Sequence, residues 1–370
     1  MQRFLITILS LILAMAIPAH AAAMRRSEEQ VSLWDNSFTL RSGVGYKDNV
    51  LLSRFAARGS WTVNNSLEWM AFRLPVDQYE VYWYTSFDDT RYTDNPGTDK
   101  EQVLVSQFSG RVRWNEKWSG GIEGRYLYQD SVFDASIAQT NFSSLKALGH
   151  QFSLKPSVRY EVNPKAYAEI EVGLVRQYLD EPLDGYWQLG PAVRLVPWKG
   201  TRLQFSLEYS PLLQYYDHRE ELLKDGSPVT GTHLMFLTHH LEAKGSWKIS
   251  TNAPLTLTVR SGMDWNRDSG SGYFDYWRNY ASPEIRWQPG RWDLRARLSW
   301  NLYDYSVQTA TAPSTATRSK QTLTTGGRIE RKINKHWSVF GDFEYERALG
   351  NVTLDEYTAS TVSLGLIFEF

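Results

Sequence analysis

The sequence predicts an all-β fold, a transmembrane antiparallel up-and-down β-barrel of about 16 strands. Three observations lead to this prediction: a final amphipathic strand ending in Phe370, an N-terminal apolar segment followed by small residues, and a strict alternation of short turns with longer loops. The mean hydropathy of −0.44 is compatible with a barrel, because only alternate residues of each strand face lipid. Beyond the N-terminal segment no apolar run is long enough for a helical span.

The end of the chain has one apolar and one polar face. One parity carries Val362, Leu364, Leu366, Phe368 and Phe370, and the other carries Thr361, Ser363, Gly365 and Glu369. An ordinary amphipathic strand at a chain end would alternate in the same way, and this alternative stays open here. The strand resembles the C-terminal signal of bacterial outer-membrane barrels. This resemblance implies that Gly365, Phe368 and Phe370 form an assembly signal and that the barrel-assembly machinery is a partner.

The N-terminus reads as a secretory signal peptide over residues 1–23. Met1–Arg3 is positively charged, Phe4–Ile17 is apolar, and Pro18–Ala23 offers Ala-x-Ala cleavage sites. The alternative is an uncleaved membrane anchor. We expect a short periplasmic segment over residues 24–36 and the barrel over residues 37–370.

Composition narrows the class of protein further. There are no cysteines, so a chain exported from the cytoplasm would need a closed sheet rather than disulfides for stability. A net charge of −1 lacks the basic bias of a nucleic-acid binder, and we expect no such partner. Aromatic residues make up 14% of the chain, as interfacial girdles at a membrane require.

Two kinds of connection alternate along the chain. The short kind is flanked by Trp, Tyr or Pro and is expected at residues 61–66, 114–118, 162–165, 197–200, 247–254, 288–290 and 333–337. The longer kind is rich in Asp, Asn, Ser, Thr and Gly and is expected near residues 47–52, 87–101, 130–147, 179–185, 217–232, 267–272, 304–319 and 347–355. Seven short turns and eight loops give fifteen connections, hence about 16 strands with both chain ends in the periplasm.

The strands between these connections alternate in polarity. From Trp292 to Leu302 every residue of one parity is apolar, and Asp293, Arg295 and Arg297 lie on the other parity. A soluble β-sandwich or propeller would show the same alternation with its polar face outward, so parity alone does not separate these folds. The parity breaks over residues 70–85, where Pro75 removes a backbone donor, and we expect a long third strand with a bulge there.

Charged residues concentrate on the parity expected to face the lumen. The basic members are Arg111, Arg113, Arg260, Arg286, Arg295 and Arg297, with Arg54 and Arg58 counted among the early ones. The acidic members are Glu169, Glu171, Glu208, Asp342 and Glu344. If the late arginines faced the middle glutamates across the lumen, a transverse field would screen solutes by charge. The alternative is a set of ion pairs that fills a closed barrel.

Catalytic and cofactor signals are weak. His240 lies on the polar parity beside Glu242, but no nucleophile is marked near it. The run from His218 to Glu221 lacks metal-ligand spacing. We therefore expect no enzymatic activity, no metal and no cofactor.

The first strand contains the motif that most resembles that of a known protein family. Ser42–Ser53 contains Gly45-Tyr46-Lys47-Asp48-Asn49-Val50, which resembles the Gly-Tyr-x-Asp-Asn-Val opening of outer-membrane barrels of the beta-barrel porin 2 type. Some proteins of that type accompany exopolysaccharide export. The resemblance implies a Gram-negative outer-membrane location. For export it also implies separate periplasmic proteins as partners, since we expect only the short segment 24–36 before the barrel and no periplasmic helical-repeat domain.

Taken together, the sequence predicts an outer-membrane channel that passes polar solutes or a secreted exopolysaccharide, with the lipids of the outer membrane around it. The alternative is a barrel that transports nothing and acts as a surface adhesin or as a hydrolase at its loop end.

Overall fold

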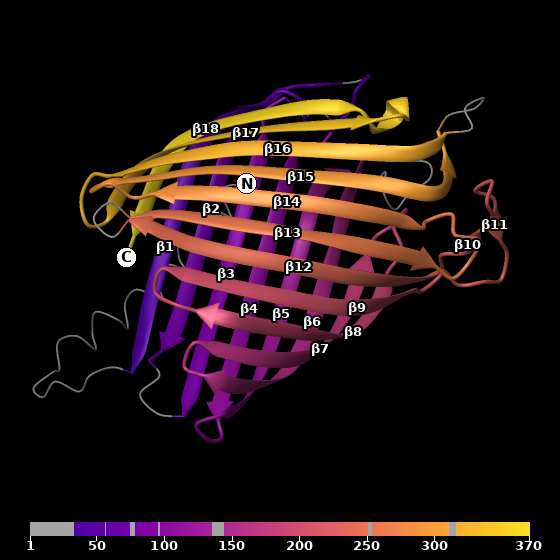
Figure 1. Ribbon diagram of the computed structural model, residues 1–370. Helices are drawn as coiled ribbons and strands as arrows, with labels where there is room; N and C mark the ends of the chain where they lie inside the picture. Colours follow the sequence, from indigo (N-terminus) through magenta and orange to yellow (C-terminus); the bar gives the residue numbers. More distant parts are fainter. Residues whose placement is uncertain are drawn as a thin grey trace, which may run out of the picture.

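Sixteen antiparallel strands close into one barrel, in which each strand pairs with its neighbours along the chain and the first strand pairs with the last (Figure 1). This computed structural model describes residues 33–55, 57–74, 78–94, 97–134, 144–250, 254–310 and 316–370. The predicted barrel and its strand count are therefore confirmed. The predicted signal peptide lies outside the described residues.

The barrel strands are numbered in chain order. The first nine are β1 (Trp34–Lys47), β2 (Ser60–Arg73), β3 (Tyr79–Tyr92), β4 (Lys100–Arg113), β5 (Trp118–Asp134), β6 (Ser144–Asn163), β7 (Ala166–Leu179), β8 (Tyr186–Lys199) and β9 (Leu203–Tyr216). The other seven are β12 (Met235–Ser250), β13 (Leu255–Asp268), β14 (Tyr276–Trp287), β15 (Trp292–Thr309), β16 (Thr317–Lys332), β17 (Trp337–Gly350) and β18 (Tyr357–Glu369). Thus β1 begins at Trp34, three residues before the expected start of the barrel at residue 37.

Two small elements lie in the longer loops. The strands β10 (Glu221–Leu222) and β11 (Pro228–Val229) form a hairpin between β9 and β12, and the 3-10 turn η1 (Thr353–Asp355) precedes β18. Among the described residues, no helix is long and apolar enough to cross a membrane.

The first short turn differs from the prediction. Residues 61–66 lie inside β2, and the chain turns instead between Arg73 and Tyr79. The two asparagines suggested a turn, but Asn64 bonds the Thr62 hydroxyl at 3.2 Å and Asn65 accepts a hydrogen bond from Ser42 of β1 at 2.9 Å. Pairing with β1 thus overrides their turn preference. The expected long third strand is wrong for the same reason, and Pro75 lies outside the described residues.

The outer surface carries the apolar parity. Exposed tryptophans gather where strands meet the short turns: Trp114, Trp118, Trp198, Trp247, Trp287, Trp292 and Trp337. Leu298, Val339 and Leu364 are exposed on the same surface between the two rims. A belt of indole rings beside an exposed apolar band is the surface that a closed barrel presents to a bilayer. The protein therefore lies in an outer membrane, and the general rule that such barrels have short periplasmic turns places the short-turn rim on the periplasmic side.

The loop after β1 is fixed to β18 at the opposite rim. The Ser360 amide donates to Asp48 at 2.6 Å, and the Asn49 amide group donates to the Thr358 carbonyl at 2.8 Å. Leu52 of this loop packs in a buried cluster with Tyr357 and Ala359. Asp48 and Asn49 therefore hold this loop against the beginning of β18.

Candidate functional site: the charged lumen

Contacts between strands that are not neighbours identify the inner face. Arg111 of β4 reaches Glu169 of β7, and Lys47 of β1 lies 3.7 Å from Glu101 of β4. Side chains of strands three apart can meet only across the concave interior. The parity of Arg111 and Glu169 is therefore the lumen parity on their strands.

All eleven charged residues selected from the sequence lie on this inner parity. They are Arg111 and Arg113 of β4, Glu169 and Glu171 of β7, Glu208 of β9, Arg260 of β13, Arg286 of β14, Arg295 and Arg297 of β15, and Asp342 and Glu344 of β17. Arg54 and Arg58 do not belong to this set. They lie in the loop after β1, where Arg54 pairs with Glu356.

Glu169 is the most enclosed carboxylate of the lumen wall. Its side chain is 4% exposed and contacts three arginines: Arg111, Arg159 at 3.2 Å and Arg194 at 3.6 Å. Arg194 also contacts Glu208 at 2.7 Å. Burial of a carboxylate is tolerated here because several cations surround it.

The late arginines have carboxylates beside them as well. Arg286 and Arg295 both form ion pairs with Asp293, and the distance from Arg295 to Asp293 is 3.1 Å. Two further ion pairs connect different strands. Arg297 of β15 pairs with Glu344 of β17, and Arg328 of β16 pairs with Asp342 of β17 at 2.6 Å. The expected separation of a basic patch from an opposing acidic patch is therefore wrong. Charges of both signs lie close together on the wall, and their attraction acts over single contacts rather than across the lumen.

Several further cations of this wall, among the residues that the structure describes, are not part of the set selected from the sequence. Arg159, Arg194, Lys244 and Arg328 share the lumen parity of their strands, and this parity was the available signal. Their partners could not be found without the register between strands, since Arg159 and Glu169 meet only when β6 pairs with β7.

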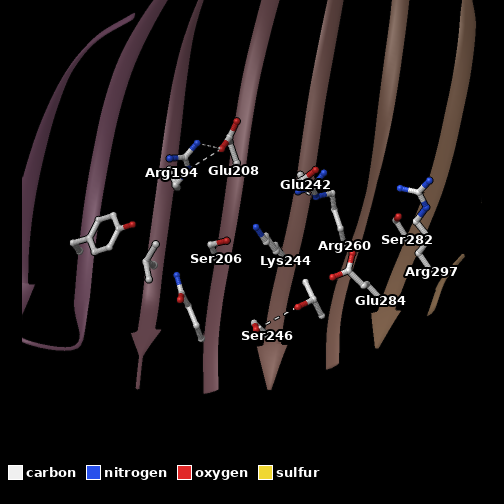
Figure 2. Close-up of a pocket in the computed structure, with 14 residues that line it drawn as sticks. Arg194, Ser206, Glu208, Glu242, Lys244, Ser246, Arg260, Ser282, Glu284 and Arg297 are labelled. Carbon is white, nitrogen blue, oxygen red and sulfur yellow. Dashed lines mark hydrogen bonds and ion pairs between the residues drawn. The ribbon is translucent and has the colours of Figure 1, made fainter. Parts of the chain in front are cut away.

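Side chains of β7 to β15 surround a recess of about 800 Å³ in the lumen wall. Figure 2 shows Arg194 and Glu208 joined at one side of it and Arg297 at the other. Lys244 and Arg260 project between them. The lining is polar, with hydroxyl groups of Ser206, Ser246 and Ser282 among the charges.

His240 belongs to a hydrogen-bonded network rather than to a recognisable catalytic set. Its Nδ1 lies 2.5 Å from Asp264, whose other oxygen accepts from Arg278 at 2.9 Å. Its Nε2 lies 3.5 Å from the Tyr280 hydroxyl. Within the described residues, no serine or threonine hydroxyl lies within hydrogen-bond distance of His240. The arrangement therefore links β12, β13 and β14 across the wall.

A group with metal-ligand chemistry lies at the outer loops. Ligand atoms of Asp184, Asp217 and His218 all lie within 4.8 Å of one another. Arg176 donates to both oxygens of Asp217, at 2.8 and 2.6 Å, and these hydrogen bonds hold the pKa of Asp217 below its usual range. A guanidinium thus already supplies the positive charge that a metal would bring.

The predicted assembly signal lies at the seam of the barrel. Gly365 is directly opposite Gly43 of β1, and Phe368 is opposite Leu40. Phe370 exchanges two backbone hydrogen bonds with Phe38, at 2.9 and 3.2 Å, while its side chain is exposed. The terminal residue therefore closes the periplasmic end of the seam.

A closed barrel with an apolar outer band and a charged, hollowed inner wall defines a channel-like outer-membrane protein. No protein-family model matches the sequence, and no curated protein matches it. Solved structures that match in architecture include outer-membrane porins. OccAB4 of Acinetobacter baumannii is 8% identical, with 92% of this chain and 99% of that chain covered and a TM-score of 0.49.

Two further structures extend this comparison. An anion-selective porin from Comamonas acidovorans is 10% identical, with 91% and 99% of the two chains covered and a TM-score of 0.45. A bacterial polysaccharide outer membrane secretin is 12% identical, with 90% and 98% covered and a TM-score of 0.42. At these identities the likeness concerns the barrel architecture alone.

Proposed function

We propose that this protein is a channel through which polar solutes cross the outer membrane. One observation carries the proposal: many charges of the inner wall remain exposed to solvent despite their ion pairs. The side chains of Arg113, Arg260 and Arg297 are 64%, 50% and 61% exposed. In a barrel filled by its own side chains such charges would be buried, at a cost of several kcal/mol each. Their exposure supports a water-filled lumen.

The pairing of charges indicates which solutes this lumen favours. Neighbouring cations and anions, such as Arg328 beside Asp342, create strong local fields that orient water and hydrogen-bonding groups. Their opposite signs cancel at longer range, so the net selectivity for small ions should be modest. Polar, hydroxyl-rich solutes fit such a wall better than apolar ones.

A secreted exopolysaccharide is the second candidate solute. The motif from Gly45 to Val50 favours it, because it resembles the opening of barrels of the beta-barrel porin 2 type. Export of a polymer would require separate periplasmic proteins to deliver it. The barrel-assembly machinery and the surrounding outer-membrane lipids complete the proposed partners.

The test is conductance of the refolded barrel in planar bilayers, joined to swelling of proteoliposomes in sugar solutions. We expect stepwise ion conductance and entry of a small neutral sugar such as maltotriose. Absence of both conductance and sugar entry would overturn the channel proposal and favour the adhesin or loop-end hydrolase. Reduction of the current by an added exopolysaccharide, without a similar effect of dextran, would support the second candidate.

A further inference from the structure

Two cations lie side by side on the lumen wall. Lys244 of β12 is directly opposite Arg260 of β13 in the strand register. A serine hydroxyl flanks each of them, since Ser206 of β9 is opposite Lys244 and Ser282 of β14 is opposite Arg260. Figure 2 shows Ser206, Lys244, Arg260 and Ser282 following one another across the recess.

Without a bound anion, the two adjacent cations reduce the stability of the folded barrel. Like charges directly opposite on paired strands repel and destabilise a sheet. Among the described residues, Arg260 has one carboxylate contact, from its Nε to Glu242 at 3.5 Å. In the part of the chain that the structure describes, no carboxylate oxygen lies within 4.0 Å of the Lys244 ammonium, and no hydrogen-bond acceptor is in contact with it. By contrast, Glu169 forms ion pairs with three arginines on the same wall.

The surroundings define the charge and polarity of a group that would fit there. Four cationic and three acidic side chains line the recess, which leaves one positive charge in excess. A singly charged anion therefore suits the recess better than a doubly charged one. The remaining lining is mainly hydroxyl and amide groups, together with the ring of Tyr167. Such groups bond sugar hydroxyls and pack against a sugar face.

We propose that Lys244 and Arg260 form a subsite that holds the carboxylate of an acidic saccharide, a uronate, in the lumen. One carboxylate placed between the two cations would remove their repulsion and form charge-assisted hydrogen bonds with both. Ser206 and Ser282 would contact the neighbouring sugar hydroxyls. The subsite's use in transport rests on the proposed channel function, but binding of the saccharide does not require conduction.

The test is equilibrium binding to the full refolded chain in detergent, measured by titration calorimetry at low ionic strength. Trigalacturonate is the probe, since each of its sugars carries a single carboxylate and one sugar can occupy the subsite. Neutral maltotriose is the comparison sugar, and galacturonate and glucose 6-phosphate compare a singly charged with a doubly charged anion. We expect trigalacturonate to bind more tightly than maltotriose. Lys244→Gln should weaken its affinity by about tenfold, which corresponds to the loss of ~1.4 kcal/mol. Arg260→Gln should weaken it similarly.

The matched control is Lys248→Gln. Lys248 lies on the same strand and the same parity as Lys244 but outside the lining of the recess. Its replacement should leave the affinity unchanged, and heat-modifiable migration on gels would show that every variant is folded. Added salt should weaken the binding of trigalacturonate but not that of maltotriose.

Four outcomes would overturn the subsite: equal affinity for the two sugars, an unchanged affinity in Lys244→Gln, an equal loss in Lys248→Gln, or tighter binding of glucose 6-phosphate than of galacturonate. Conductance measured on the same preparation separates the two proposals. Specific binding without conductance would leave the subsite standing and remove the channel. Conductance without specific binding would do the reverse.

Discussion

Gly43 of β1 lies directly opposite Gly365 of β18, and the ring of Phe340 packs against both glycines where the barrel closes. A Cβ atom at Gly365 would lie 2.2 Å from the Ser42 carbonyl oxygen and 2.7 Å from the Phe340 ring. A Cβ at Gly43 would lie 2.6 Å from the Leu364 carbonyl oxygen. The seam thus depends on two residues without side chains and on an aromatic ring that fills the space above them.

Replacement of Gly365 by Val should weaken closure of the barrel. Because the clash is with backbone, the two strands must separate, at a cost of about 1–3 kcal/mol or more. We expect a lower urea midpoint and less heat-modifiable protein. Gly124→Val is the matched control, since a Cβ at Gly124 has no atom within 4 Å. Equal losses in the two variants would contradict the role of the seam.

The orientation of β15 predicts a large loss of stability at one residue and a small loss at its neighbour. Leu298→Arg places a charge on the lipid-facing surface in the middle of the strand and should reduce the unfolding free energy by about 2–4 kcal/mol. Arg297→Leu removes a half-solvated lumen charge paired with Glu344 and should cost much less. Urea unfolding in lipid vesicles measures both values. The reverse order would mean that the inside and outside of the strand had been exchanged.

The fold could be predicted from the sequence because its signals are local. Alternation of polarity, tryptophans beside short turns, and the final amphipathic strand each involve residues close in the chain. The turn wrongly placed at residues 61–66 shows the limit, because Asn64 and Asn65 prefer turns in isolation yet lie within the sheet when β2 pairs with β1.

The candidate site required information that is not local. Parity indicated that Arg297 and Glu344 face inward, but not that they form an ion pair across β16. The same limit applied to Glu169, whose three arginine partners come from β4, β6 and β8. Without the register, the sequence predicted a basic patch facing an acidic patch. The register instead brings basic and acidic side chains into direct contact.

Glu169 and Glu171 should contribute very differently to stability. Glu169→Gln leaves three adjacent arginines without their shared counter-charge and should reduce the unfolding free energy by about 3 kcal/mol. Glu171 lies on the same face of β7, and in the described part of the chain its one ion pair is with Lys155 at 3.7 Å. Glu171→Gln should therefore cost less than about 1 kcal/mol. Urea midpoints at neutral pH give the comparison. Similar midpoints would show that the Glu169 contacts do not stabilise the wall.

Removal of two lumen arginines should change the ion selectivity of the channel. Arg295 contacts Asp293 and Arg297 contacts Glu344. Replacing both arginines with Gln leaves Asp293 with Arg286 and the Gln288 amide, and removes the cation paired with Glu344. The excess negative charge should move the reversal potential in a salt gradient toward cation preference.

Folding of this double variant should be retained, because Gln suits a water-filled wall. Arg331→Gln on β16 is the matched control, since Arg331 faces outward, where it packs over Trp292. Its reversal potential should equal that of the unmodified protein. If the double variant conducts with unchanged selectivity, Arg295 and Arg297 do not line the ion path.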